Sequence, residues 1–195
     1  ISSWGGPEVG MAGAYATQLA HRLGFVIDAY GLASSSSKLD PQWAYERFAN
    51  AFMPALAGAD ILSGVGGMES GLSGGYAIAV IDNEMIGLMK HIIAGCAVND
   101  ETLAFDVMKE TILGDGVFLS QMHTVRQMRK GVIWAPEVSE RALNTGDDPN
   151  AGVVARARQR AREILATHQV EPLPDDVSRH LSEIVEQARR ELVKT

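Results

Sequence analysis

Cysteine is nearly missing from this chain of 195 residues, which contains Cys96 alone. One cysteine can form no disulfide within the chain and excludes a cysteine-rich metal site, and such scarcity is typical of the reducing cytoplasm. Long apolar runs are missing too, because the longest, Tyr76–Ile81, falls far short of the about 20 residues that cross a bilayer. No basic segment precedes an apolar one at the start, as it would in a secretion signal. We therefore expect a cytoplasmic protein with no membrane partner.

An excess of basic residues is also absent. The chain has 17 Lys and Arg against 24 Asp and Glu, which gives a net charge of −7. Proteins that bind nucleic acids need a basic face to displace counterions from phosphates, so we expect no nucleic-acid partner. The 46% hydrophobic and 21% charged residues are typical of an ordinary globular domain with a sizeable core.

The common catalytic motifs are not found. The chain has no phosphate-binding Gly-x-x-x-x-Gly-Lys-Ser/Thr loop, no His-Glu-x-x-His zinc motif and no Gly-x-Ser-x-Gly nucleophile turn. Gly64-Val-Gly66 begins like a dinucleotide-binding loop, but Glu69 stands where the third glycine belongs. These observations point away from nucleotide-dependent, zinc-dependent and serine-hydrolase chemistry, and they indicate no metal site.

Glycine and aromatic residues divide the chain into two parts. Residues 1–150 contain 19 of the 20 glycines and all 12 aromatic residues, whereas residues 151–195 contain one glycine and no aromatic residue. The turn-forming residues of 144–150 mark the joint. We expect a body over 1–143 and a helical appendage over 144–195. In the appendage the sequence predicts one helix from Ala155 and a second over Val177–Leu192, with the arginines from Arg156 to Arg162 on a solvated face.

Helices alternate with short apolar strands in the body. The pattern predicts strands over 25–30, 59–65 and 117–120, and its helices are expected over 9–23, 40–56, 76–94 and 100–112. Such repeats build a parallel sheet or a β/α barrel. Three strands are too few for a barrel of eight, and the chain begins without Met, so we expect an α/β fragment of a longer protein, with the choice between a parallel sheet and a barrel left open.

The best candidate site is the loop 66–75. It contains five glycines, which let the backbone approach a ligand, and one carboxylate, Glu69, which can face a cation or a leaving group. A flexible connector with a solvated glutamate is the alternative. Sites on parallel α/β folds gather where the strands end, which is where this loop is predicted.

Three further groups of polar residues are candidates. Asp82, Asn83 and Glu84 interrupt an apolar helix, so they need hydrogen-bond donors or a solvent-filled groove, and a structural role is as compatible with the sequence as catalysis. His123 follows the third predicted strand, where a barrel places reactive side chains. The serine-rich segment 34–37 and Lys38 follow the first strand and lie on the same predicted face.

A series of short motifs runs along the chain in a fixed order. They are Gly5–Glu8, Ser37–Gln42, Met68–Ser73, Ile81–Glu84, Val98–Ala104, Phe118–Thr124 and Trp134–Glu137. Together they resemble the C-terminal portion of the trimethylamine methyltransferase family of corrinoid-dependent enzymes. The resemblance spans essentially the whole chain and implies a β/α barrel of more than twice this length. It therefore implies an α/β protein that supplies the C-terminal part of a TIM-type (β/α)8 barrel plus C-terminal helices.

The resemblance also implies an activity. Members of that family move a methyl group from a methylated or quaternary amine to the cobalt of a separate corrinoid protein. The chain would then use cob(I)alamin carried by that partner and bind no cofactor tightly itself. The founding members use pyrrolysine near the position of Lys38, and an ordinary lysine there places this chain with the members that lack pyrrolysine, for which betaine-like substrates are expected.

The same resemblance suggests roles for the candidate residues. Carboxylates and aromatic rings hold quaternary ammonium groups, so Glu69 with Tyr30 or Tyr76 would form part of a cage, and Lys38 or His123 would bind a substrate carboxylate. We take Glu69 and His123 as candidate catalytic residues. The candidate substrate-binding residues are Tyr30, Lys38, Ser70, Tyr76, Asp82 and Asn83.

Two other functions remain open at this point. A binding module would keep the cage without transferring a methyl group, and an inactive structural fragment would do neither. Open strand edges and the apolar 76–94 helix would otherwise be exposed, so we expect a homo-oligomer.

Overall fold

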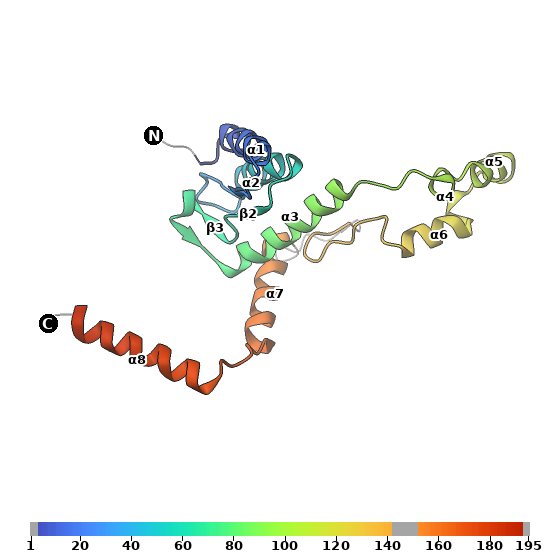
Figure 1. Ribbon diagram of the computed structural model, residues 1–195. Coiled ribbons are helices and arrows are strands. Elements are labelled where there is room, and N and C mark those ends of the chain that lie inside the picture. The colour runs from blue at the N-terminus through green and yellow to red at the C-terminus, as the bar shows by residue number, and fades with distance from the viewer. Residues whose placement is uncertain (1–3, 142–151, 193–195) are drawn as a thin grey trace. The chain divides into compact units, whose positions relative to one another are not determined.

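The computed structural model describes residues 4–141 and 152–192 (Figure 1). Its elements, in chain order, are α1 (Pro7–Arg22), β1 (Asp28–Tyr30), α2 (Pro41–Leu56), β2 (Ile61–Ser63), β3 (Gly67–Met68), the short 3-10 helix η1 (Glu69–Gly71), β4 (Ser73–Gly74), α3 (Tyr76–Ala94), α4 (Asp100–Leu103), α5 (Phe105–Leu113), the 3-10 helix η2 (Phe118–Ser120), α6 (Met122–Arg129), α7 (Val153–Thr167) and α8 (Asp175–Leu192). The protein is thus mixed α/β and mostly helical.

The chain divides into two compact units, residues 1–162 and 163–195. The predicted joint at 144–150 lies outside the described residues, so the boundary at 143/144 stays a prediction. Both tail helices predicted from the sequence are present as α7 and α8. No helix among the described residues is long and apolar enough to cross a membrane.

The first two helices begin where the sequence places their start signals. Pro7 stands at the first position of α1, followed by the acidic Glu8. Asp40 caps α2, because its side chain accepts a hydrogen bond from the Trp43 N–H at 2.9 Å, and Pro41 follows it. The two helices lie side by side (Figure 1), and a Cβ on Gly10 of α1 would come within 3.1 Å of α2 backbone atoms. Glycine at that position therefore permits the close packing.

The strands β1 and β2 pair in parallel, with Ala29 opposite Leu62 and Tyr30 opposite Ser63. Helix α2 connects them, so the predicted strand–helix–strand unit is confirmed for the first two strands. This sheet has two strands among the described residues, and the small antiparallel hairpin of β3 and β4 forms a separate sheet. The larger barrel remains a prediction.

The third predicted strand is wrong. Residues 118–120 form the 3-10 turn η2 instead, and His123 therefore lies in the first turn of α6 rather than at the end of a strand. Local side chains bind the backbone groups that a sheet would use. The Asp115 carboxylate accepts the Val117 N–H at 2.9 Å, and the Ser120 hydroxyl donates to the Val117 carbonyl at 2.8 Å.

The helix predicted over 100–112 is interrupted. Ala104 adopts a left-handed conformation (φ 50°), which ends α4 and precedes α5. Asn99 and Thr102 form a reciprocal capping box that fixes the start of α4. The short α4 is therefore a capped turn that the helical period alone does not reveal.

The core of the first unit joins elements that are distant in sequence. Helix α3 contributes the buried Ile78 and Ile81, which pack with Trp43 of α2, Val138 and Ala157 of α7. A second cluster joins Leu32, Ala51 and Met89. Helix α3 thus lies between the loops that follow the strands and the segment around Val138.

Candidate functional site

Two loops meet beyond the carboxyl ends of the parallel strands. Loop A, residues 31–39, follows β1, and loop B, residues 64–75, follows β2 and contains the β3–β4 hairpin. The backbone N–H of Ser70 in loop B donates to the Ser34 carbonyl of loop A at 2.9 Å. The carboxyl edge of parallel strands is where α/β enzymes place their ligand sites.

Strained backbone is concentrated in these two loops. Four described residues other than glycine have positive φ, and three of them are Leu32 in loop A (48°) with Glu69 (51°) and Ser70 (57°) in loop B. Each such residue costs about 1–3 kcal/mol and persists where the surroundings impose it, most often at functional sites. The strain marks the tip of the hairpin as a candidate ligand site.

The Glu69 side chain lies at that tip. Its carboxylate accepts a hydrogen bond from the Ser73 hydroxyl at 2.7 Å, in an exposed setting. The hydroxyl of Tyr30 approaches the same hairpin, since it would lie 3.7 Å from a Cβ placed on Gly71. Tyr30 is 39% exposed and makes an edge contact with the ring of Trp4, at 5.4 Å between centroids. The Tyr30 hydroxyl therefore reaches the hairpin that carries the Glu69 carboxylate.

Side chains from α2 hold loop A. The Glu46 carboxylate accepts from the Ser34 hydroxyl at 2.8 Å and from the Ser35 N–H at 2.9 Å. Buried Asn50 donates to the Ala33 carbonyl at 3.3 Å and accepts from a backbone N–H of α1. Lys38 is exposed near the end of this loop, where its ammonium group can reach solvent.

A buried ion pair holds loop B. Arg47 of α2 and Asp82 of α3 are 1% and 0% exposed, and the Arg47 Nε donates to Asp82 Oδ1 at 2.9 Å while its Nη2 donates to Asp82 Oδ2. Burial raises the pKa of the Asp82 carboxyl above its ordinary value, and the hydrogen bonds and charge of Arg47, with the Gly66 N–H, oppose that rise. Asp82 thus has the donors that its place on an apolar helix requires.

The neighbouring residues of α3 behave differently. Asn83 is exposed, whereas the Glu84 carboxylate accepts hydrogen bonds from the N–H groups of Glu137, Val138 and Ser139 and from the Ser139 hydroxyl. Burial alone would raise the pKa of Glu84, but these hydrogen bonds outweigh it and hold the pKa below its ordinary value. Glu84 therefore attaches the 137–139 segment to α3.

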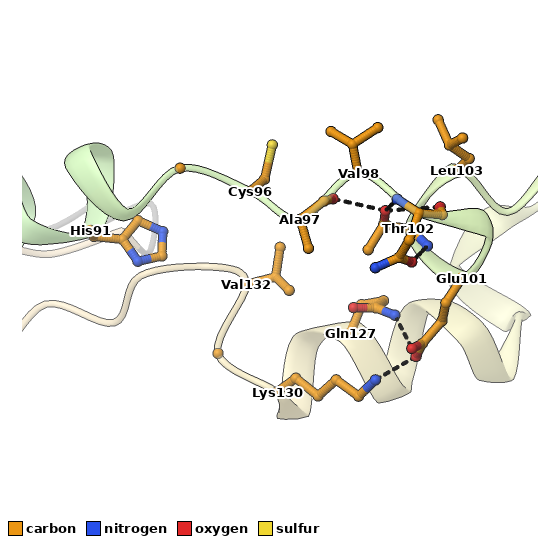
Figure 2. Close-up of a pocket in the computed structure, with 13 residues that line it drawn as sticks. His91, Cys96, Ala97, Val98, Glu101, Thr102, Leu103, Gln127, Lys130 and Val132 are labelled. Carbon is orange, nitrogen blue, oxygen red and sulfur yellow. Dashed lines mark hydrogen bonds and ion pairs between the residues drawn. The ribbon is translucent and has the colours of Figure 1, made fainter.

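His123 lies in a different cluster. Its Nε2 donates to the Glu101 carbonyl at 2.7 Å, which joins α6 to α4. The Glu101 carboxylate pairs with Lys130 and accepts from Gln127 at 3.1 Å, and Lys130 is the main cause that lowers its pKa. An open cavity of about 650 Å³ adjoins this cluster. Figure 2 shows its lining, which includes His91, Cys96, Thr102, Gln127, Lys130 and Val132.

The structure brings some predicted residues together and leaves others apart. Ser70, next to Glu69 in loop B, contacts loop A, which also contains Lys38, and the Tyr30 hydroxyl approaches Gly71 of loop B. Asp82 lies beneath loop B, where it accepts the Gly66 N–H. Tyr76, at the start of α3, is 70% exposed, and the contacts of His123 are with Glu101 and Gln127 rather than with loop B. The roles predicted for these residues stay predictions.

Sequence reasoning missed the three α2 residues that support the loops: Glu46, Arg47 and Asn50. The signal for Arg47 was indirect, since Asp82 on an apolar helix demands a buried cation and helix 40–56 contains one arginine. Among the described residues, no group of three His, Cys, Asp or Glu side chains could hold a metal ion.

Loops that carry a carboxylate beyond parallel strands define an α/β protein with a candidate site for a cationic ligand. Comparison with known protein families identifies the family within this class of α/β proteins. The family model of trimethylamine methyltransferase (MTTB) matches residues 2–193, so the chain belongs to the trimethylamine methyltransferase family.

Individual relatives agree with this assignment. The chain is 34% identical over 190 residues to trimethylamine methyltransferase MttB of Desulfitobacterium hafniense, covering 96% of this chain and 38% of that protein. It is 31% identical over 189 residues to MttB1 of Methanosarcina mazei, covering 94% and 37%. It is 27% identical over 192 residues to a glycine betaine methyltransferase of Desulfitobacterium hafniense, covering 97% and 40%. The chain thus spans less than half the length of these relatives.

Proposed function

We propose that this chain is part of a cytoplasmic methyltransferase that moves a methyl group from a methylated or quaternary amine, such as a betaine, to the cobalt of a corrinoid protein. Family membership supports methyl transfer from a methylated amine, because relatives are named for trimethylamine and for glycine betaine. The observation that carries the site assignment is the strained hairpin tip, where Glu69 lies in loop B and the Tyr30 hydroxyl approaches Gly71, two residues further along the chain.

The residues at the hairpin tip suit a quaternary ammonium group. Such a group has no N–H to donate, so a site can hold it through carboxylate charge and aromatic faces. Each cation–π contact contributes about 0.5–2 kcal/mol. Glu69 supplies the charge in this proposal and Tyr30 the ring, while Lys38, on the neighbouring loop, pairs with the carboxylate of a betaine.

The protein itself needs no nucleophile in this reaction. The corrinoid, carried by a partner protein, supplies a strongly nucleophilic cobalt, so the residues of this chain bind the amine, orient its methyl group and exclude water. Ser70 and Asn83 are proposed to line the substrate site and His123 to act in catalysis. The chain forms homo-oligomers in this proposal, because β1 and β2 have no further partner strand among the described residues.

A transfer assay tests the proposal. The intact protein is mixed with cob(I)alamin and, in turn, with trimethylamine, glycine betaine and other methylated amines, and the absorbance change of methylcobalamin formation is followed. The expected result is transfer from at least one of these donors, slowed by Glu69→Gln. Binding of an amine without any transfer would instead indicate a binding module, and neither binding nor transfer would contradict the proposal.

A further inference from the structure

We infer that the buried pair Arg47 and Asp82 is a positioning device for the candidate amine site, which sets the hairpin tip that carries Glu69. The inference rests on the proposed function, because it concerns the same site. It goes further by assigning a role at a distance to two residues that do not face the ligand.

The Arg47–Asp82 pair forms hydrogen bonds with the backbone at the base of the hairpin. Beyond its contacts to Asp82, Arg47 donates to the Gly67 carbonyl at 2.7 Å through Nη1 and to the Gly64 carbonyl at 3.1 Å through Nη2. Asp82 in turn accepts the Gly66 N–H at 2.7 Å through Oδ2. One ion pair thus binds three backbone groups within four consecutive residues.

The hairpin depends on such anchors because it is very short. Its strands β3 and β4 have two residues each, and a small isolated hairpin is not stable in water. The tip beyond these strands holds Glu69 and Ser70 in left-handed conformations, which cost energy unless the surroundings impose them. The contacts to Arg47 and Asp82 at the base and the hydrogen bond from Ser70 to Ser34 near the tip impose that geometry.

The pair is also well fixed in space. Arg47 and Asp82 come from two long helices, α2 and α3, and the Arg47 guanidinium lies 5.0 Å from the ring centroid of buried Trp43. The planar guanidinium donates two hydrogen bonds to the carboxylate of Asp82 and one to each of two carbonyls, whereas an ammonium group has three donors and no fork to match the carboxylate. The base of the hairpin is therefore tied to the helical framework.

A double-mutant cycle separates positioning from general stability. The probe is tetramethylammonium, titrated into the intact protein by calorimetry, with the variants Asp82→Asn, Glu69→Gln and both together. If Asp82 acts through Glu69, Asp82→Asn raises the Kd roughly tenfold in the wild-type background and less than about twofold in the Glu69→Gln background. Equal effects in the two backgrounds, or an unchanged Kd for folded Asp82→Asn, would overturn the inference.

Two further variants complete the design. Arg47→Lys keeps a positive charge beside Asp82 but loses the guanidinium fork that binds the Gly64 and Gly67 carbonyls. If Asp82→Asn does not fold, Arg47→Lys replaces it in the double-mutant cycle with Glu69→Gln. Glu84→Gln is the matched control on α3, because Glu84 holds residues 137–139 and not loop B. It should leave the Kd unchanged within about twofold. An unchanged Kd for Glu69→Gln alone would count against the proposed amine site itself, which distinguishes the two failures.

Discussion

Replacing Glu84 by Gln should detach the 137–139 segment from α3. The carboxylate accepts four hydrogen bonds, two of them at 2.7 Å from the Glu137 N–H and 2.8 Å from the Ser139 N–H. The amide of glutamine keeps one acceptor oxygen. Its NH2 group is a donor and cannot accept the hydrogen bonds of the backbone N–H groups that bind the carboxylate. Hydrogen bonds to a charged group contribute about 1.5–3 kcal/mol each, so losing two of the four should cost about 3–6 kcal/mol at pH 7.

The lowered pKa of Glu84 determines how the stability difference between wild type and Glu84→Gln changes with pH. The pKa of Glu84 is lower in the folded protein than its ordinary value of 4.5, so its stabilising contribution is complete above that value and is lost as the pH falls through the folded pKa. The difference in unfolding free energy between wild type and Glu84→Gln should therefore be largest near neutral pH and shrink below about pH 4.5.

Urea unfolding of both proteins across this pH range measures that difference, and hydrogen exchange of the 137–139 amides reports the local attachment. Faster exchange in the variant at neutral pH is expected. A difference that stays constant down to pH 3, or a variant as stable as wild type at pH 7, would refute the reasoning.

Three smaller predictions concern the α4–α6 region. Ala104→Gly should stabilise the protein by about 0.5–1 kcal/mol in thermal unfolding, because glycine adopts the left-handed conformation at φ 50° without steric cost; destabilisation would contradict this. Asn99→Ala should remove the capping box with Thr102 and cost about 1 kcal/mol in the same assay, whereas an unchanged melting temperature would show that the cap does not stabilise α4. His123→Gln should slow methyl transfer in the cob(I)alamin assay but leave amine affinity unchanged in calorimetry, because the hydrogen bonds of His123 are with Glu101 and Gln127 rather than with loops A and B; a weakened affinity would place the ring in the amine-binding site.

Local signals predicted the first half of the fold well. Pro7 and Asp40 mark the starts of α1 and α2, and the apolar run at 59–65 contains β2. The same reasoning failed at 117–120, where Asp115 and Ser120 bind the backbone locally and a short apolar run forms a 3-10 turn. A four-residue run does not distinguish these outcomes, because its hydrogen-bond partners decide between them.

The candidate site was predictable in part. Five glycines around one carboxylate indicated the loop 66–75 within loop B, and Asp82 on an apolar helix indicated either hydrogen-bond donors or a solvent-filled groove. The identity of the donor was indicated only indirectly, because Arg47 lies 35 residues away and meets Asp82 only through the packing of α2 against α3. The left-handed backbone at Glu69 and Ser70 is likewise imposed by contacts from α2, α3 and loop A rather than by local preference.

The central claim is that a methylated amine binds where loops A and B meet. Hydrogen exchange of the intact protein with and without saturating glycine betaine tests it most directly. The account predicts slower exchange in residues 31–39 and 64–75 when the ligand is bound, with little change elsewhere. Protection confined to residues 95–103 and 127–132, which line the cavity beside Glu101, would contradict it.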